Sequence, residues 1–176
     1  LRSVLMADFL TAYSLTQPDK AAVIDDRPDG AVTTMTYGQL NEQANRLANV
    51  LLDLGARPGE TKVVWCGQNS PGLVVMINAA RKLGVTAVPL NYRLSDEEAT
   101  YVADHCDAEI VYVDAEFAPL FKRIRQGLPK VREFLVFDGH VPAGMVDVDA
   151  AMAAASPGEP EVPATTEAGA TMIYTS

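Results

Sequence analysis

The chain has 176 residues, of which 48% are hydrophobic and 21% are charged, which is enough for one domain with a sizeable core and unlike disordered, collagen-like or coiled-coil sequences. Its 14 Lys and Arg against 23 Asp and Glu give a net charge of −9, which excludes a general nucleic-acid-binding surface. No run approaches the roughly 18 apolar residues of a transmembrane segment, and the first residues lack a secretory signal pattern. Cys66 and Cys106 lie in apolar segments without metal-ligand spacing, so we expect a cytoplasmic protein with reduced thiols.

Residues 1–37 are predicted to form a short helix followed by a β-hairpin. The helix is expected over roughly residues 3–15. The hairpin strands are expected at 21–24 and 33–36, because the turn-forming residues 25–30 separate two short β-prone segments.

The next predicted unit, residues 38–138, repeats a strand and a helix. Four short apolar segments start 24, 23 and 23 residues apart. They are residues 62–66, 86–90, 109–113 and 132–137. Continuous rather than alternating hydrophobicity is typical of parallel strands that are covered on both faces. Because each interval leaves room for one crossover helix, the pattern predicts an α/β fold with parallel-sheet βαβ layers.

Helix-start signals precede the expected helices. The expected N-caps are Thr36, Ser70 and Ser95, and a further helix is expected from about Ala118. Gln39 and Glu98 complete capping boxes, and Gly55 suits the left-handed position that ends a helix. The helix from Pro71 to about Leu83 is apolar over most of its circumference, which indicates packing between two layers.

The last part of the chain changes character. Residues 139–169 are expected to hold a helix and then an acidic linker rich in Pro and Gly, exposed over 156–163. Residues 170–176 are predicted to form one more buried strand. Since a domain seldom ends on an apolar strand, we expect this sequence to be a piece of a longer protein.

Two groups of residues follow predicted strands, at the edge where α/β sheets bind ligands. Tyr174, Thr175 and Ser176 close the last predicted strand, and their hydroxyls can donate hydrogen bonds to phosphate oxygens. Arg93 follows the strand at 86–90, where its guanidinium can meet a phosphate. The alternatives are a strand end that only turns polar as it reaches water and an ordinary surface arginine.

Other polar residues have structural explanations. His105 and His140 lack a visible nucleophile or carboxylate partner, so we expect solvated or capping roles. Residues 25–26 and 96–98 suit a turn and a helix cap better than a metal site, and the basic residues within 122–132 suit a solvated helix face. We therefore expect no catalytic residue and no metal ligand within these 176 residues.

Four segments match motifs of one enzyme superfamily. They are TYGQL at 36–40 for "TYxEL", RKLGVTAVPLNYRL at 81–94 for "KLGAVAVPLNxRL", DHCDAEIV at 104–111 for "DSxAKVV", and YTS at 174–176 for the start of the phosphate loop "YTSGTTGxPKG". Their order and separation agree over almost the whole chain, while Gln68 replaces the usual Pro before Asn-Ser. The chain thus resembles the adenylate-forming superfamily of acyl-CoA synthetases, peptide-synthetase adenylation domains and beetle luciferases.

The resemblance implies that the chain is part of the large N-terminal domain of an enzyme that uses ATP and Mg²⁺ to form an acyl-adenylate and then an acyl thioester, usually with coenzyme A. Thr175 and Ser176 would be the first hydroxyls that hold the ATP phosphates, and Arg93 would bind a phosphate of coenzyme A. The remaining loop residues, the adenine and Mg²⁺ sites and a catalytic lysine would lie beyond Ser176. We therefore expect the 176 residues alone to be inactive.

Several alternatives remain open at this point. The pattern PLNYRL at 89–94 favours an acyl-CoA synthetase for a fatty or other apolar acid over a peptide-synthetase adenylation domain. A non-catalytic α/β binding or oligomerisation module and an unrelated flavodoxin-like nucleotide binder are the other candidates. A homodimer and peripheral contact with a membrane are both compatible with the sequence.

Overall fold

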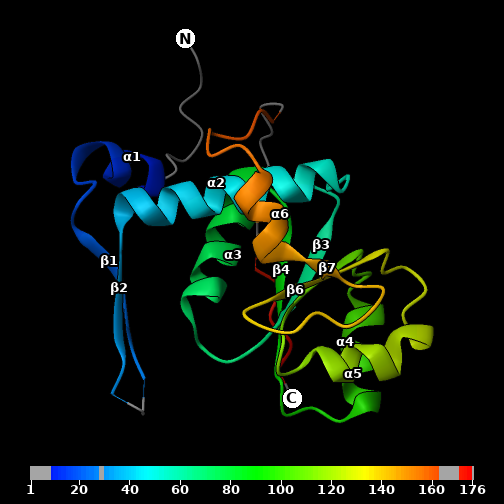
Figure 1. Ribbon diagram of the computed structural model, residues 1–176. Helices are drawn as coiled ribbons and strands as arrows, with labels where there is room; N and C mark the ends of the chain where they lie inside the picture. The colour runs from blue at the N-terminus through cyan, green and yellow to red at the C-terminus, as the bar shows by residue number, and fades with distance from the viewer. Residues whose placement is uncertain (1–8, 28–29, 163–170, 176) are drawn as a thin grey trace.

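A computed structural model describes residues 9–27, 30–162 and 171–175 of the chain (Figure 1). A β-hairpin stands beside a parallel sheet that carries helices on both faces. The strands are β1 (Ala21–Asp26), β2 (Val32–Thr36), β3 (Lys62–Cys66), β4 (Thr86–Leu90), β5 (Ile110–Asp114), β6 (Glu133–Phe137) and β7 (Val146–Asp147). The helices are α1 (Phe9–Thr16), α2 (Tyr37–Asp53), α3 (Pro71–Leu83), α4 (Asp96–His105), α5 (Ala118–Ile124) and α6 (Val148–Ala154), with a 3-10 turn η1 (Arg125–Gly127).

The main sheet has five strands in the order β4-β3-β5-β6-β7, and all its pairs are parallel. Its strands bury side chains on both faces. Val63 belongs to a core shared with α2, α3 and α6, whereas Val64 belongs to a second core shared with α4 and α5. Figure 1 shows these two groups of helices on opposite sides of the sheet. Burial on both faces explains the continuous apolar runs, and the predicted α/β fold is confirmed.

The predicted helix caps are confirmed. Thr36 and Ser95 each form a complete capping box with the residue three positions later, and Ser70 caps α3 ahead of Pro71. Gly84 ends α3 with a φ of 69°, in the left-handed region that favours glycine. These local signals fix where each crossover helix begins and therefore where each strand's following loop lies.

Some boundaries differ from the prediction. The strands expected at 109–113 and 132–137 begin one residue later, at Ile110 and Glu133, within the usual uncertainty of element ends. The hairpin strands are longer than expected. The first helix covers Phe9–Thr16, and the part predicted over 3–8 lies outside the described residues.

The acidic linker differs from its prediction. Residues 156–162 are largely exposed, as expected, but they are held on the surface of α2. The side-chain amides of Asn45 and Asn49 donate hydrogen bonds of 2.9–3.0 Å to backbone carbonyls of this segment. The Glu159 carboxylate lies 2.7 Å from the Lys82 ammonium, whose side chain is only 2% exposed. Composition predicted the exposure but not these contacts.

The predicted buried strand at 170–176 is wrong over its described part, residues 171–175. Thr171 forms one parallel bridge with Ala87 of β4, and the amide of Met172 donates to the Ala87 carbonyl. Ile173 is 69% exposed. The reason is that β4 lies at the edge of the sheet, and no other described element covers the outer side of this segment. No described helix is both long and apolar enough to cross a membrane.

Candidate functional site

A cleft of about 800 Å³ lies at the carboxyl ends of β3 and β4, and we call it the β4 cleft. The loops that follow these two strands form its walls, together with the start of α4 and the segment 171–175. Polar groups come from Asn69, Asn91, Thr175 and the carboxylates of Glu97 and Glu98, and aromatic rings from Trp65, Tyr92, Tyr101 and Tyr174. A concave site with a few polar groups at this edge of an α/β sheet is the usual place for a ligand.

The structure places Thr175 at the rim of this cleft. Thr171 lies opposite Ala87 in a parallel pairing. Thr175 lines the cleft together with Asn91, which follows the last residue of β4. The predicted position at the carboxyl edge thus arises from a single bridge to an edge strand, and Ser176 lies outside the described residues. The role of both hydroxyls in phosphate binding stays a prediction.

Arg93 lies in the loop between β4 and α4, between two residues that line the cleft. Its amide donates a 3.0 Å hydrogen bond to Oδ1 of Asn91, and its guanidinium carbon lies 5.4 Å from the centre of the Tyr92 ring. The Tyr92 ring in turn packs on Phe117, with centroids 4.8 Å apart. Among the residues that the structure describes, no carboxylate pairs with Arg93. The guanidinium is therefore exposed and available to an anion.

The acidic residues at the start of α4 serve the helix. Glu98 accepts hydrogen bonds from the backbone amide and the hydroxyl of Ser95, which lower the pKa of its carboxyl. Asp96 forms a two-bond ion pair with Arg123 at 2.8 and 2.9 Å, and hydrogen bonding from that guanidinium lowers the pKa of Asp96. These contacts agree with the prediction that the acidic residues at 96–98 stabilise the start of a helix.

Three cations of the predicted basic cluster, Arg123, Lys130 and Arg132, are paired with carboxylates. Lys130 lies 3.1 Å from a carboxylate oxygen of Asp104 and 2.9 Å from one of Asp107. Arg132 lies 3.4 Å from Glu109 and also donates to the backbone carbonyl of Leu54. Such neutralised cations fit a solvated face rather than a site for an anionic partner.

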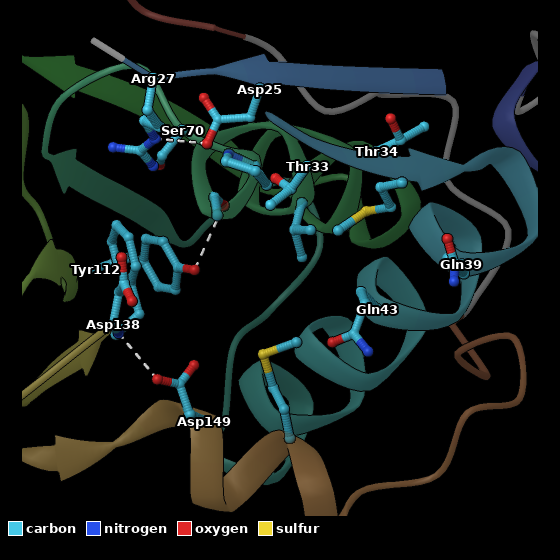
Figure 2. Close-up of a pocket in the computed structure, with 16 residues that line it drawn as sticks. Asp25, Arg27, Thr33, Thr34, Gln39, Gln43, Ser70, Tyr112, Asp138 and Asp149 are labelled. Carbon is cyan, nitrogen blue, oxygen red and sulfur yellow. Dashed lines mark hydrogen bonds and ion pairs between the residues drawn. The ribbon is translucent and has the colours of Figure 1, made fainter. Parts of the chain in front are cut away.

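A second hollow, of about 610 Å³, lies between the hairpin, α2, the start of α3 and the end of β6 (Figure 2). Asp25 pairs with Arg27 at 2.6 Å on its hairpin wall, and the backbone amide of Asp138 donates to the Asp149 carboxylate on the opposite wall. Its lining thus carries three carboxylates and one guanidinium that is already paired. The β4 cleft is lined by two carboxylates, Glu97 and Glu98, without a lysine or arginine, so charge does not distinguish the two hollows. The β4 cleft is the candidate site because Thr175 lines it. Sequence reasoning could not find this hollow between the hairpin and α2, because its only local signal is the polar turn of the hairpin.

Neither cysteine is a suitable nucleophile. Burial and the nearby Asp114 carboxylate raise the pKa of the Cys66 thiol to about 12. Burial also raises the pKa of the Cys106 thiol. Both thiols are therefore protonated near neutral pH, and only the thiolate attacks an electrophile.

The two histidines have different surroundings. His140 is exposed in the loop after β6, as expected. His105 is also exposed, as expected, at the end of α4, and its Nδ1 atom lies 2.7 Å from the hydroxyl of Tyr174. The sequence could not show this pairing, because the two residues are 69 positions apart.

A family model and a curated relative both point to the same enzyme family. The model of the family described as "AMP-binding enzyme" matches residues 11–176. The chain is 34% identical over 109 residues to a crotonobetaine/carnitine–CoA ligase of Salmonella paratyphi A, an alignment that covers 62% of this chain and 21% of that protein. The chain thus spans about a fifth of the length of this curated relative.

Solved structures agree with the family. A Mycobacterium tuberculosis fatty acyl CoA synthetase is 27% identical, with a TM-score of 0.78 over 95% of this chain and 32% of that chain. A putative long-chain-fatty-acid CoA ligase from Rhodopseudomonas palustris, at 22% identity, shares the fold with a TM-score of 0.81 over 94% of this chain and 40% of that chain. Because the family model matches residues 11–176, the chain belongs to the AMP-binding enzyme family.

Proposed function

We propose that this chain forms part of the nucleotide site of an AMP-forming acyl-CoA synthetase. The observation that carries the proposal is the position of Thr175 at the rim of the β4 cleft, which Asn91 also lines, at the carboxyl edge of the sheet. The adjacent Ser176 would supply a second hydroxyl. Arg93, on the neighbouring loop, would bind a phosphate of coenzyme A.

The proposed reaction has two steps. A carboxylate oxygen of the acid attacks the α-phosphorus of ATP, and the bond to pyrophosphate breaks. The thiol of coenzyme A then attacks the acyl carbonyl of the adenylate, its proton passes to a base, and AMP leaves. The first step is useful because AMP is a far better leaving group than hydroxide.

The residues of the cleft supply hydrogen bonds but little positive charge. Its described lining contains no lysine or arginine, while it contains Glu97 and Glu98. A triphosphate therefore needs cations from elsewhere, which supports our expectation that the 176 residues alone do not turn over. The described residues also gather no group of three or more His, Cys, Asp or Glu side chains that could hold a metal. We expect Mg²⁺ to be held largely by the phosphates of the nucleotide, as is common for this ion.

The acid is proposed to be fatty or otherwise apolar. The Mycobacterium tuberculosis neighbour is named for fatty acyl groups, whereas the Salmonella relative is named for crotonobetaine and carnitine. The pattern at 89–94 supports the CoA-ligase branch but leaves the acid to be measured. A panel of fatty, aromatic and betaine acids with the protein expressed from its complete reading frame distinguishes these classes.

The experiment that tests the nucleotide site replaces Thr175 by Val, which keeps the shape and removes the hydroxyl. Because a hydrogen bond to a charged group contributes about 1.5–3 kcal/mol, we expect the KM for ATP to rise about 10- to 100-fold. Thr171→Val is the matched control, since Thr171 pairs with β4 through its backbone. An unchanged KM for ATP in an active Thr175→Val protein would remove Thr175 from the proposed site.

Arg93→Gln tests the coenzyme A contact separately. We expect a higher KM for coenzyme A and an unchanged rate of adenylate formation, because adenylation precedes thiol binding. A fall in the adenylation rate instead would assign Arg93 to the nucleotide. If no acid supports adenylation by the complete protein, the alternative of a non-catalytic module of this family holds.

A further inference from the structure

Tyr174, next to Thr175, is held by the end of α4. Its hydroxyl lies 2.7 Å from Nδ1 of His105, and the two rings meet edge to face with centroids 5.7 Å apart. Tyr101, one turn earlier on α4, stacks on the His105 ring with centroids 5.2 Å apart. Three rings from two distant parts of the chain thus form one continuous contact at the wall of the β4 cleft.

The α4 side of this contact is firm. The helix begins with the capping box of Ser95 and packs Ala99, Val102 and Ala103 into the second core. His105 is its last residue, so the imidazole is presented from a fixed backbone. A side chain on a packed helix positions a partner better than a side chain on a loop.

The segment that carries Thr175 has few other anchors among the described residues. Its backbone is joined to β4 by the Thr171 bridge and the bond from the Met172 amide, and both contact the same residue, Ala87. Ile173 is largely exposed. Tyr174 is the residue of this segment that packs against the second core. Beyond Met172, the side chain of Tyr174 therefore fixes the path of the chain.

We propose that His105 is a positioning residue for the phosphate-binding segment, holding the Tyr174 hydroxyl and thereby placing Thr175 at the rim of the cleft. This inference rests on the proposed function, because it matters for ligand binding only if Thr175 contacts the nucleotide. His105 touches no substrate in this account. The contact raises the fraction of molecules in which Thr175 is in the binding position before ATP arrives. Loss of the contact lowers that fraction and therefore lowers the apparent affinity for ATP.

The test uses His105→Ala, His105→Asn and Tyr174→Phe in the protein expressed from its complete reading frame. A hydrogen bond of this kind is worth about a 2- to 10-fold change in an equilibrium. We expect His105→Ala and Tyr174→Phe each to raise the KM for ATP by about that factor, with kcat changed less than about twofold. The double variant should be no worse than either single one, because both remove the same bond.

His105→Asn separates positioning from a general structural role. Its side-chain amide keeps a hydrogen-bonding atom near the Nδ1 position, so it should restore the KM for ATP to within about twofold of the unaltered protein. His140→Ala is the matched control for loss of an exposed imidazole, and it should leave the KM unchanged. Hydrogen exchange at residues 171–175 without ligand should be faster in His105→Ala than in the unaltered protein.

The outcomes are distinguishable. An active protein in which His105→Ala leaves both the KM for ATP and the exchange of 171–175 unchanged refutes the inference alone. Equal loss in His105→Asn and His105→Ala, with an unaltered KM and a lower kcat, also overturns it. An unaltered protein that adenylates no acid refutes the proposed function and the inference with it.

Discussion

Replacing Glu159 by Ala tests the contact that fixes the acidic linker on the body of the protein. The carboxylate accepts hydrogen bonds from Lys82 at 2.7 Å, from Asn41 at 3.0 Å and from Asn45 at 3.1 Å. Partial burial raises the pKa of Glu159, but these hydrogen bonds outweigh burial and hold the pKa below its usual value. The Lys82 ammonium, whose side chain is 2% exposed, also donates a 2.8 Å hydrogen bond to the hydroxyl of Thr11, so Glu159→Ala removes only one of these two partners.

The size of the effect follows from these surroundings. Breaking a buried ion pair by removing one partner costs about 3–5 kcal/mol. The Glu159 side chain is 48% exposed, so water can partly replace it, and we reduce the expected loss to about 1.5–3 kcal/mol. For a chain of this length, that corresponds to a fall in Tm of about 3–12 °C. Lys82→Met removes the buried positive charge and leaves only the partly exposed Glu159 carboxylate without its partner. Its loss in free energy of unfolding should therefore be smaller than that of Glu159→Ala.

Thermal and urea denaturation measure this loss. Glu161→Ala is the matched control, because Glu161 is exposed on the same linker and has no bonded partner among the described residues. The control should change the free energy of unfolding by less than about 0.5 kcal/mol. If Glu159→Ala is as stable as Glu161→Ala, the linker is not fastened through this carboxylate and our account of residues 156–162 is wrong.

Three further effects follow from local geometry. Gly72→Ala should destabilise the protein by about 1–3 kcal/mol in urea denaturation, because the added Cβ would lie 2.9 Å from the Phe137 ring. Ser95→Ala should cost about 1 kcal/mol by the same assay, since it removes the hydroxyl that caps α4 and one hydrogen bond to Glu98. The pKa of Glu159 in the folded protein lies below its ordinary value of 4.5. Ionised Glu159 should therefore stabilise the fold at pH values above 4.5, and this contribution should be lost as the pH falls through the lowered pKa. Glu159→Gln should therefore flatten the acid limb of the stability curve, and a limb identical to that of the unaltered protein would count against the assignment.

The sequence predicts the layered part of the fold well because its signals are local. Continuous apolar runs marked β3, β4, β5 and β6, and the hydroxyls of Thr36, Ser70 and Ser95 marked the starts of three helices. Each of these features is set by residues within one turn or one strand. Neighbouring residues therefore suffice to find them.

The parts that the sequence missed depend on long-range contacts. Composition marked residues 156–162 as an exposed linker, yet Glu159 meets Lys82 from 77 positions away. The pattern at 170–176 predicted a buried strand, but its described part, 171–175, lies at the edge of the sheet and is largely exposed. The partnership of His105 with Tyr174 likewise appears only when the chain is folded. For the candidate site, the motif predicted that Thr175 lies at the carboxyl edge of the sheet, whereas the proposal that His105 positions it required the structure.

Exchange of labelled pyrophosphate into ATP tests the central claim most directly. Adenylation is reversible and needs only ATP, Mg²⁺ and the acid, so coenzyme A can be left out. We predict that the protein from the complete reading frame catalyses this exchange only when a carboxylic acid is present, and that Thr175→Val weakens the dependence on ATP. Exchange that proceeds without any acid, or that is absent for every acid while the protein is folded, would contradict the account.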